Sequence, residues 1–186
     1  YSYEELNSAI NCLVETFDTL RIRIKSEKNE PIMSIDEFKF KNYPFAYFNS
    51  DSELYDASIK HTNTPIEIKD ELIKCVIFQT PTKSGFILGL HHIIIDGFST
   101  QIMADFFDNY LNNRPYIPEK FQSYEEYVNA EETYKNSSRY NRDKKFWEEQ
   151  FLTEPICSVV SQAQKGLDYT SSEQNSYISN EIFVKI

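Results

Sequence analysis

Two adjacent histidines, followed by an acid and a glycine, are the residues in this chain best suited to chemistry. They form the segment His91-His92-Ile93-Ile94-Ile95-Asp96-Gly97, between an apolar run over 86–90 and a helical pattern that starts near Phe98. Histidine is the side chain best suited to moving a proton near neutral pH. The end of a buried element is a position that a substrate can reach. The segment therefore predicts a site for proton transfer or hydrogen bonding.

The expected strand limits how the two imidazoles can act. If 86–90 is a strand, alternation sends His91 and His92 to opposite sides, one toward the interior and the other toward a cleft. Diverging rings do not easily chelate one ion, and no Cys or carboxylate cluster stands near them at zinc spacing, so we predict no metal. His61, the third histidine, lies in a polar helical pattern and is interpreted as an ordinary core or surface residue.

The acid and the glycine of the segment have structural interpretations. Asp96, at the entrance of the predicted helix, can cap backbone N–H groups or hold an arginine. We favour a buried carboxylate that locks the loop over a catalytic acid, since acids at helix starts are commonly caps. Gly97 can adopt a positive φ angle and lets backbone or ligand approach closely.

Composition narrows the class of protein. With 186 residues, 40% of them hydrophobic, the chain can form one sizeable domain or one lobe of a larger one. A net charge of −10 argues against a nucleic-acid partner, and four glycines argue against a Gly-rich nucleotide loop. No apolar run approaches the ~20 residues that span a bilayer, so we predict no membrane partner. Cys12, Cys75 and Cys157 are widely spaced, which favours reduced thiols and a cytoplasmic protein.

Hydrophobic periodicity predicts that helices and strands are interspersed along the chain. Capping boxes at Ser2/Glu5 and Ser123/Glu126 mark two helix starts, and the helix over 98–111 is expected to bury a wide apolar stripe. Further helices are expected over 51–63 and 140–151, and strands over 20–24, 32–35, 45–48, 72–79, 85–91 and 177–186. We assign 1–152 to one lobe and 153–186 to a connection and strand that lead toward a second, C-terminal lobe.

Three segments resemble motifs of condensation domains of nonribosomal peptide synthetases, and their order along the chain fits the family. Residues 90–99 resemble the signature MHHIIxDGWS, 18–24 resemble the end of RHExLRTxF with matches at Leu20 and Arg21, and 124–127 resemble YxDY. The chain departs from the family pattern at several positions. These are Thr16 for Arg, Phe17 for His, Asp18 for Glu, Ile22 for Thr and Phe98 for Trp.

The resemblance implies a fold and a set of roles. The fold is that of chloramphenicol acetyltransferase, an α/β fold (an α+β sandwich) with two lobes, and this chain would form a lobe in which helices pack on a mixed sheet. The histidine loop would lie where a tunnel crosses between the two lobes. The resemblance also implies that His92 is the catalytically central residue, that Asp96 holds the loop and that Arg21 pairs with Asp96, while His91 and Gly97 complete the motif. A bidentate guanidinium–carboxylate contact would fix such a loop. Taken alone, Arg21 is interpreted as a solvated charge on an amphipathic strand.

The implied reaction is amide formation between two thioesters carried on 4′-phosphopantetheine arms, with no cofactor bound directly. The implied partners are donor and acceptor carrier proteins, the C-terminal lobe and an adjacent adenylation domain. His92 would act as a base or as a positioning group, and the sequence leaves both open. Ser99 lies in a predicted helix and no GxSxG elbow occurs, so an acyl-enzyme route is disfavoured.

Three other functions stay open at this stage. They are an epimerization domain of the same superfamily, an acyltransferase that uses coenzyme A, and a non-catalytic docking domain with a relic motif. A heterocyclization domain is disfavoured, because that class carries aspartate where this chain has His91.

Overall fold

The computed structural model describes residues 1–115 and 123–153. The chain divides into two compact units, residues 1–137 and 138–186, and each is described by itself. This division precedes the boundary that the sequence suggested after residue 152. The connection and strand predicted over 153–186 lie outside the described residues, except for Thr153.

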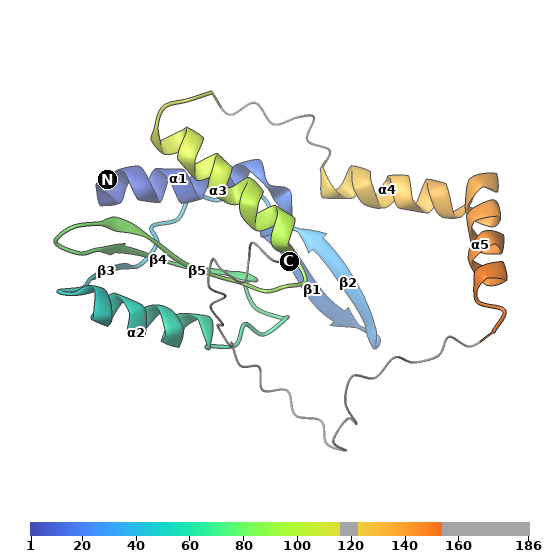
Figure 1. Cartoon of the computed structure of the whole chain (residues 1–186), viewed down its shortest axis with the longest axis horizontal. Coiled ribbons are helices and arrows are strands. Elements are labelled where there is room, and N and C mark those ends of the chain that lie inside the picture. Colours follow the sequence, from blue (N-terminus) through green and yellow to red (C-terminus); the bar gives the residue numbers. More distant parts are fainter. Residues whose placement is uncertain (116–122, 154–186) are drawn as a thin grey trace, which may run out of the picture. The chain divides into compact units, whose positions relative to one another are not determined.

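A mixed three-stranded sheet forms the centre of the first unit (Figure 1). Its order is β3 (Phe45–Tyr47), β4 (Ile73–Gln79) and β5 (Ser84–Leu90), with β4 parallel to β3 and antiparallel to β5. The β4–β5 register pairs Ile73 with Leu90. The predicted pair of neighbouring apolar strands is therefore confirmed, and it places the end of β5 beside the start of β4.

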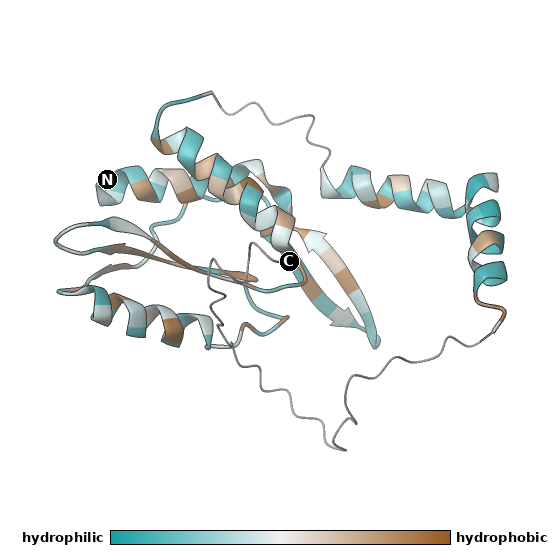
Figure 2. Cartoon of the chain, viewed as in Figure 1, coloured by the Kyte–Doolittle hydropathy of each residue, from teal (hydrophilic) through white to brown (hydrophobic). Residues whose placement is uncertain are grey.

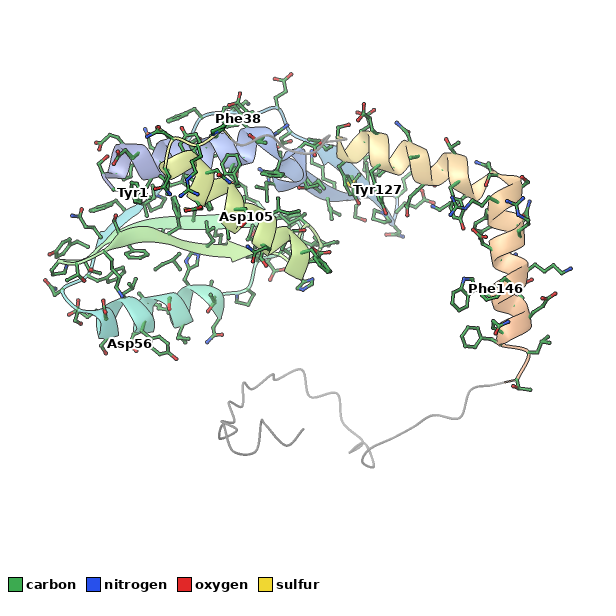
Figure 3. All side chains as sticks on the ribbon, turned by 45° about the horizontal axis from the view of Figure 1, so that its top comes forward. Tyr1, Phe38, Asp56, Asp105, Tyr127 and Phe146 are labelled. Carbon is green, nitrogen blue, oxygen red and sulfur yellow. The ribbon has the colours of Figure 1, made fainter. Side chains whose placement is uncertain are left out.

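Three helices cover the two faces of this sheet. Helices α1 (Tyr3–Thr16) and α3 (Gly97–Leu111) lie on one face, and α2 (Asp51–Thr62) lies on the other (Figure 1). The predicted capping box starts α1, since Ser2 Oγ accepts from the Glu5 amide at 3.2 Å and Glu5 accepts from the Ser2 amide at 2.7 Å. On α2, Asp56 points away from the sheet (Figure 3).

The hydrophobic core lies between the sheet and helices α1 and α3. Its buried members come from these elements and from the turn after α1. They are Leu6, Ile10, Leu13, Val14, Leu20, Ile73, Cys75, Ile77, Met103 and Phe106. Figure 2 shows this pattern as brown on β4 and β5, whereas α4 and α5 are mostly hydrophilic. Within the described ranges, no helix combines the length and apolarity that crossing a membrane requires.

A separate hairpin follows α1. A short 3₁₀ helix, η1 (Asp18–Arg21), leads into β1 (Ile22–Glu27), which pairs antiparallel with β2 (Glu30–Ile35). The predicted strand start at Leu20 is therefore wrong, because the Leu20 amide bonds back to the Phe17 carbonyl in the 3₁₀ turn. The hairpin turn is Lys28-Asn29, both with positive φ, as a tight two-residue connection requires.

Helix α4 (Tyr124–Lys135) begins at the second predicted capping box, formed by Ser123 and Glu126. Its first amide, that of Tyr124, donates to Asp18 Oδ2 at 2.9 Å. Two of the segments that resemble family motifs thus meet at the start of α4. In the second unit, α5 (Ser138–Gln150) carries exposed aromatic side chains, among them Phe146, which projects from the helix (Figure 3).

The wide buried stripe predicted for α3 is only partly present. Met103 and Phe106 are buried, but Phe98 is 86% exposed and Ile102 is 43% exposed. Helical periodicity identifies which residues share a face, but what covers that face depends on the rest of the fold. Among the described residues, the part of α3 near Phe98 is left without cover.

The central strand gives the first stability prediction. Ile77→Ala removes a fully buried side chain from β4 and should lower the free energy of unfolding by about 2–5 kcal/mol, because it leaves a cavity in the core. The matched control is Ile32→Ala on β2, where the side chain is 43% exposed and the cost should be much smaller. Denaturant unfolding of the chain measures both. Equal losses in the two variants would contradict the assigned core.

Candidate active site

The histidine loop is positioned at both ends. The His91 amide donates to the Leu72 carbonyl at 2.9 Å, beside the start of β4, and the Ile94 amide donates to the His91 carbonyl at 3.1 Å. Ile94 and Ile95 pack against the core cluster, and α3 begins at Gly97. The loop is therefore fixed at its start by backbone hydrogen bonds and at its end by the packing of Ile94 and Ile95 on the core.

Helix α3 in turn is held by aromatic contacts. Phe107 stacks on Phe86 of β5 with ring centroids 4.6 Å apart, and Phe106 contacts Phe17 edge to face at 5.8 Å. Such pairs add specific geometry to apolar burial. The helix that follows the loop is thus fixed both to the strand that precedes the loop and to the residue after α1.

His91 serves the loop itself. Its ring is half-buried, and Nδ1 accepts a hydrogen bond from the Ile93 amide at 3.1 Å. A nitrogen that accepts carries no proton, so the neutral ring holds its proton on Nε2. The imidazole of His91 therefore orders the turn that presents His92.

His92 is the exposed member of the pair. It lies in the turn after β5 and lines a groove of about 620 Å³, which His91 also lines. The prediction that one ring faces the interior and the other a cleft is therefore wrong. The strand ends at Leu90, one residue before the pair, so strand alternation does not extend over both histidines.

Asp96 is the N-cap of α3. Its Oδ1 accepts from the Ser99 amide at 2.8 Å and from the Ser99 hydroxyl at 2.7 Å. These bonds, the side-chain one first, lower the pKa of the Asp96 carboxyl below its ordinary value. The predicted capping is confirmed, but the predicted burial is wrong, because the carboxylate lies at the surface beside the groove.

Gly97 is the first residue of α3 and has no positive φ, so that part of the prediction is wrong. An added Cβ would meet no atom within 4 Å. The space above this residue is open, and this is consistent with the close approach of another group to the groove.

Arg21 does not contact Asp96 in the structure, which corrects the pairing that the resemblance implied. The guanidinium donates instead to the carbonyls of Val14 at 2.5 Å, Glu15 at 2.7 Å and Asp36 at 3.0 Å. The first two carbonyls belong to the last turn of α1, whose acceptors have no partner within the helix. Arg21 therefore caps the C-terminus of α1, a position where a cation is favoured by the helix dipole.

Arg23 forms an ion-pair network that the sequence did not reveal. It pairs with Asp36 at 2.8 Å and with Glu71 at 3.0 Å, and Lys41 also pairs with Glu71. In the sequence, the alternation of Arg21 and Arg23 indicated only a charged strand face. The acidic partners of Arg23 lie elsewhere in the chain, and sequence spacing does not reveal such pairs. The network ties the β1–β2 hairpin to Glu71, next to the residue that holds His91.

His61, like Arg23, has a position in the structure that the sequence did not predict. It lies on the last turn of α2 and lines the same groove as His91 and His92. Its ring packs over Gly89 of β5, where an added Cβ would lie 3.3 Å from Nε2. The only sequence signal was a glycine within the apolar run before the histidines, which indicates a close approach but not the approaching group.

The groove holds few charged groups. Among the residues that line it, Asp96 is the one acid, and Lys and Arg are absent. Within the described residues, no group of three or more His, Cys, Asp or Glu side chains could hold a metal ion. The arrangement can therefore offer imidazole nitrogens and hydroxyl groups to a largely neutral substrate.

A mixed sheet flanked by helices, with a histidine-bearing loop at the end of a central hairpin, defines an α/β domain with a histidine-centred groove. A sequence model of the condensation domain matches residues 2–185, and the chain belongs to this family. Surfactin synthase subunit 1 of Bacillus subtilis (strain 168) is similar to this chain, with 21% identity over an alignment of 193 residues. The alignment covers 96% of this chain and 5% of the relative.

Two solved structures share the fold. One is the epimerization domain from the third module of tyrocidine synthetase B, with a TM-score of 0.70 and 18% identity over 85% of this chain and 39% of that one. The other is from a condensation domain that mediates chain release from the enacyloxin polyketide synthase, with a TM-score of 0.73 and 17% identity over 83% of this chain and 32% of that one. The predicted α/β class is confirmed, and the chain spans a small part of each relative.

The cap at Asp96 gives a prediction that depends on pH. Asp96→Ala should lower the thermal midpoint by a few degrees at pH 7, because the Ser99 amide loses its acceptor. The folded pKa lies below the unfolded one, so the stabilisation by the carboxylate is full above the unfolded pKa and is lost as pH falls through the folded pKa. Asp96→Asn keeps an acceptor and should lose this pH dependence. Thermal melts across acidic pH measure both, and an Ala variant with the wild-type midpoint at pH 7 would contradict the cap.

A double-mutant cycle tests whether Arg21 only caps α1 or also pairs with Asp96. If Arg21 caps α1 and Asp96 caps α3, the effects of Arg21→Ala and Asp96→Ala on stability should add, because the side chains share no partner. If the two form an ion pair in the complete protein, the double variant should lose clearly less than the sum. Thermal unfolding of the two single variants and the double variant decides between these outcomes.

Proposed function

We propose that this chain is the N-terminal half of a condensation domain that forms an amide bond between two carrier-bound thioester substrates. The observation that carries the proposal is the exposed imidazole of His92 in a groove, on a loop that matches the family motif. In this role His92 is the catalytic residue, and His91, Asp96 and Gly97 set the loop. Arg21 supports the same region through the end of α1.

The reaction requires little covalent work from the protein. The α-amine of one substrate attacks the thioester carbonyl of the other, and the thiol of the donor arm leaves. Thioesters are already activated, so correct positioning supplies much of the acceleration. An α-ammonium has a pKa of about 8, and its proton must leave before or during the attack. His92 either accepts this proton or holds the amine by a hydrogen bond.

The character of the groove supports carrier-bound substrates over free coenzyme A. A phosphopantetheine arm presents neutral amides inside such a groove and keeps its phosphate near the carrier. The nucleotide of coenzyme A brings further phosphates, which favour Lys and Arg side chains, and none line this groove. The proposed partners are donor and acceptor carrier proteins, the C-terminal lobe and an adjacent adenylation domain, with no cofactor bound directly. A cytoplasmic location stays a prediction.

Epimerization is the second candidate function, and the likeness to a solved epimerization domain favours it. The same imidazole would then exchange the proton of an α-carbon, and no amide would form. The two reactions differ in product. Mass spectrometry detects a condensed product, whereas chiral analysis detects an inverted residue on a single carrier. A docking domain with a relic motif would yield neither.

The catalytic assignment gives a direct prediction. His92→Ala, made in the complete two-lobed protein, should lower the rate of amide formation by roughly 10²–10⁴-fold, the usual contribution of a positioned acid–base group. Folding should be unchanged, because the side chain is exposed. Single-turnover transfer between loaded carriers measures the rate, and circular dichroism checks the fold.

His92→Gln separates the two roles of the imidazole. An amide can hold the amine by a hydrogen bond but does not accept a proton at neutral pH. Partial recovery in the Gln variant would identify a positioning role, and failure to recover would identify a base. Wild-type rates of product formation in His92→Ala would exclude His92 as the catalytic residue.

A further inference from the structure

The three histidines of the chain line one groove. His91 and His92 come from the loop after β5, and His61 comes from the last turn of α2, about thirty residues earlier in the chain. Helix α2 packs against β5, so the two sources meet across the sheet face opposite α1 and α3. The proposed reaction uses His92, and His91 orders the turn, but neither role accounts for His61.

Gly89 allows the imidazole of His61 to approach the strand. Leu88 and Leu90 pack toward the core cluster, so Gly89, between them, faces α2. A methyl group there would lie 3.3 Å from Nε2 and 3.5 Å from Cδ2 of His61. The ring therefore lies over the strand two residues before the loop. Its position is set by the absence of a side chain at Gly89.

The imidazole of His61 lacks a hydrogen-bond partner for one of its nitrogens. Nε2 is buried, and no described residue bonds to it. Buried polar atoms are nearly always paired, because an unpaired one loses its bond to water without replacement. An unpaired nitrogen in a residue that lines the proposed substrate groove favours a partner that arrives with the substrate.

We propose that His61 is a substrate-binding residue that forms a hydrogen bond with an amide group of the thioester arm in the groove. This proposal rests on the proposed function for the identity of the arm. A neutral imidazole can donate to an amide oxygen or accept from an amide N–H, and His61 lines the groove in which the arm would lie. His61 thus holds the arm while His92 acts at the reacting groups.

The test compares variants that separate the ring from its nitrogens. His61→Phe keeps an aromatic ring over Gly89 but has no hydrogen-bonding atom, whereas His61→Gln restores one. Lys60→Ala is the matched control, since Lys60 is exposed, lies in the same helical turn and does not line the groove. Each variant is made in the complete protein. The measurements are the Kd for pantetheine, KM and kcat for transfer between loaded carriers, and the thermal midpoint.

The loss of one hydrogen bond corresponds to about a 3- to 10-fold effect. His61→Phe should raise the Kd for pantetheine and the KM by that factor, with kcat within twofold and the thermal midpoint unchanged. His61→Gln should recover much of the loss, and Lys60→Ala should match the wild type. A Kd and KM within twofold of the wild type in His61→Phe would overturn the proposal and leave His61 as a packing residue.

Gly89→Ala provides a second test in case His61→Phe does not fold. The added methyl group should displace the imidazole and raise the KM in the wild-type background, but not in His61→Ala, where the ring is absent. Equal effects in both backgrounds would overturn the proposal. Failure of the wild-type protein to form an amide would instead refute the proposed function. In that case, binding of pantetheine alone decides the role of His61.

Discussion

The antiparallel pairing of β4 with β5 is the constraint on which the site depends. It brings Leu72 beside His91, whose amide donates to the Leu72 carbonyl, and β5 ends at Leu90, directly before the two adjacent imidazoles. The chain then turns over Ile94 and Ile95, which pack on the core, and enters α3 at Asp96. These contacts are a backbone hydrogen bond between strands, apolar packing and a local helix cap, so the described residues hold the loop without an ion pair.

This support explains how much of the site the sequence could predict. Periodicity and capping boxes located α1, α2, α3, α4, β4 and β5, because those signals are local. The cap at Asp96 is also a local contact, with Ser99. The contacts that escaped prediction join distant segments: His61 with Gly89, Arg23 with Glu71, and Asp18 with Tyr124. Sequence spacing carries no information about such pairs until the topology is known.

The case of Arg21 shows how a residue can match a motif and still have a different partner. The match fixed its place in the chain but not its rotamer. In the structure the last carbonyls of α1 lie close to the guanidinium, and buried or partly buried carbonyls without partners are strong acceptors for a charged donor. Asp96 is already satisfied by Ser99, so neither group lacks a partner when the two stay apart.

The start of α3, directly after the histidine loop, exposes apolar side chains. Phe98 and Ile102 lie in the first turns of α3, next to the loop, with exposed fractions of 86% and 43%. Large exposed apolar patches commonly mark an interaction surface. The groove is walled by α2 on one side and by the start of α3 on the other, but it remains open above Gly97. A reaction that moves a proton at His92 benefits from the exclusion of water, because electrostatic interactions strengthen in a dry site. The described residues therefore provide the imidazoles and the walls of the groove, and a cover above Gly97 would complete the dry environment that the proposed role of His92 requires.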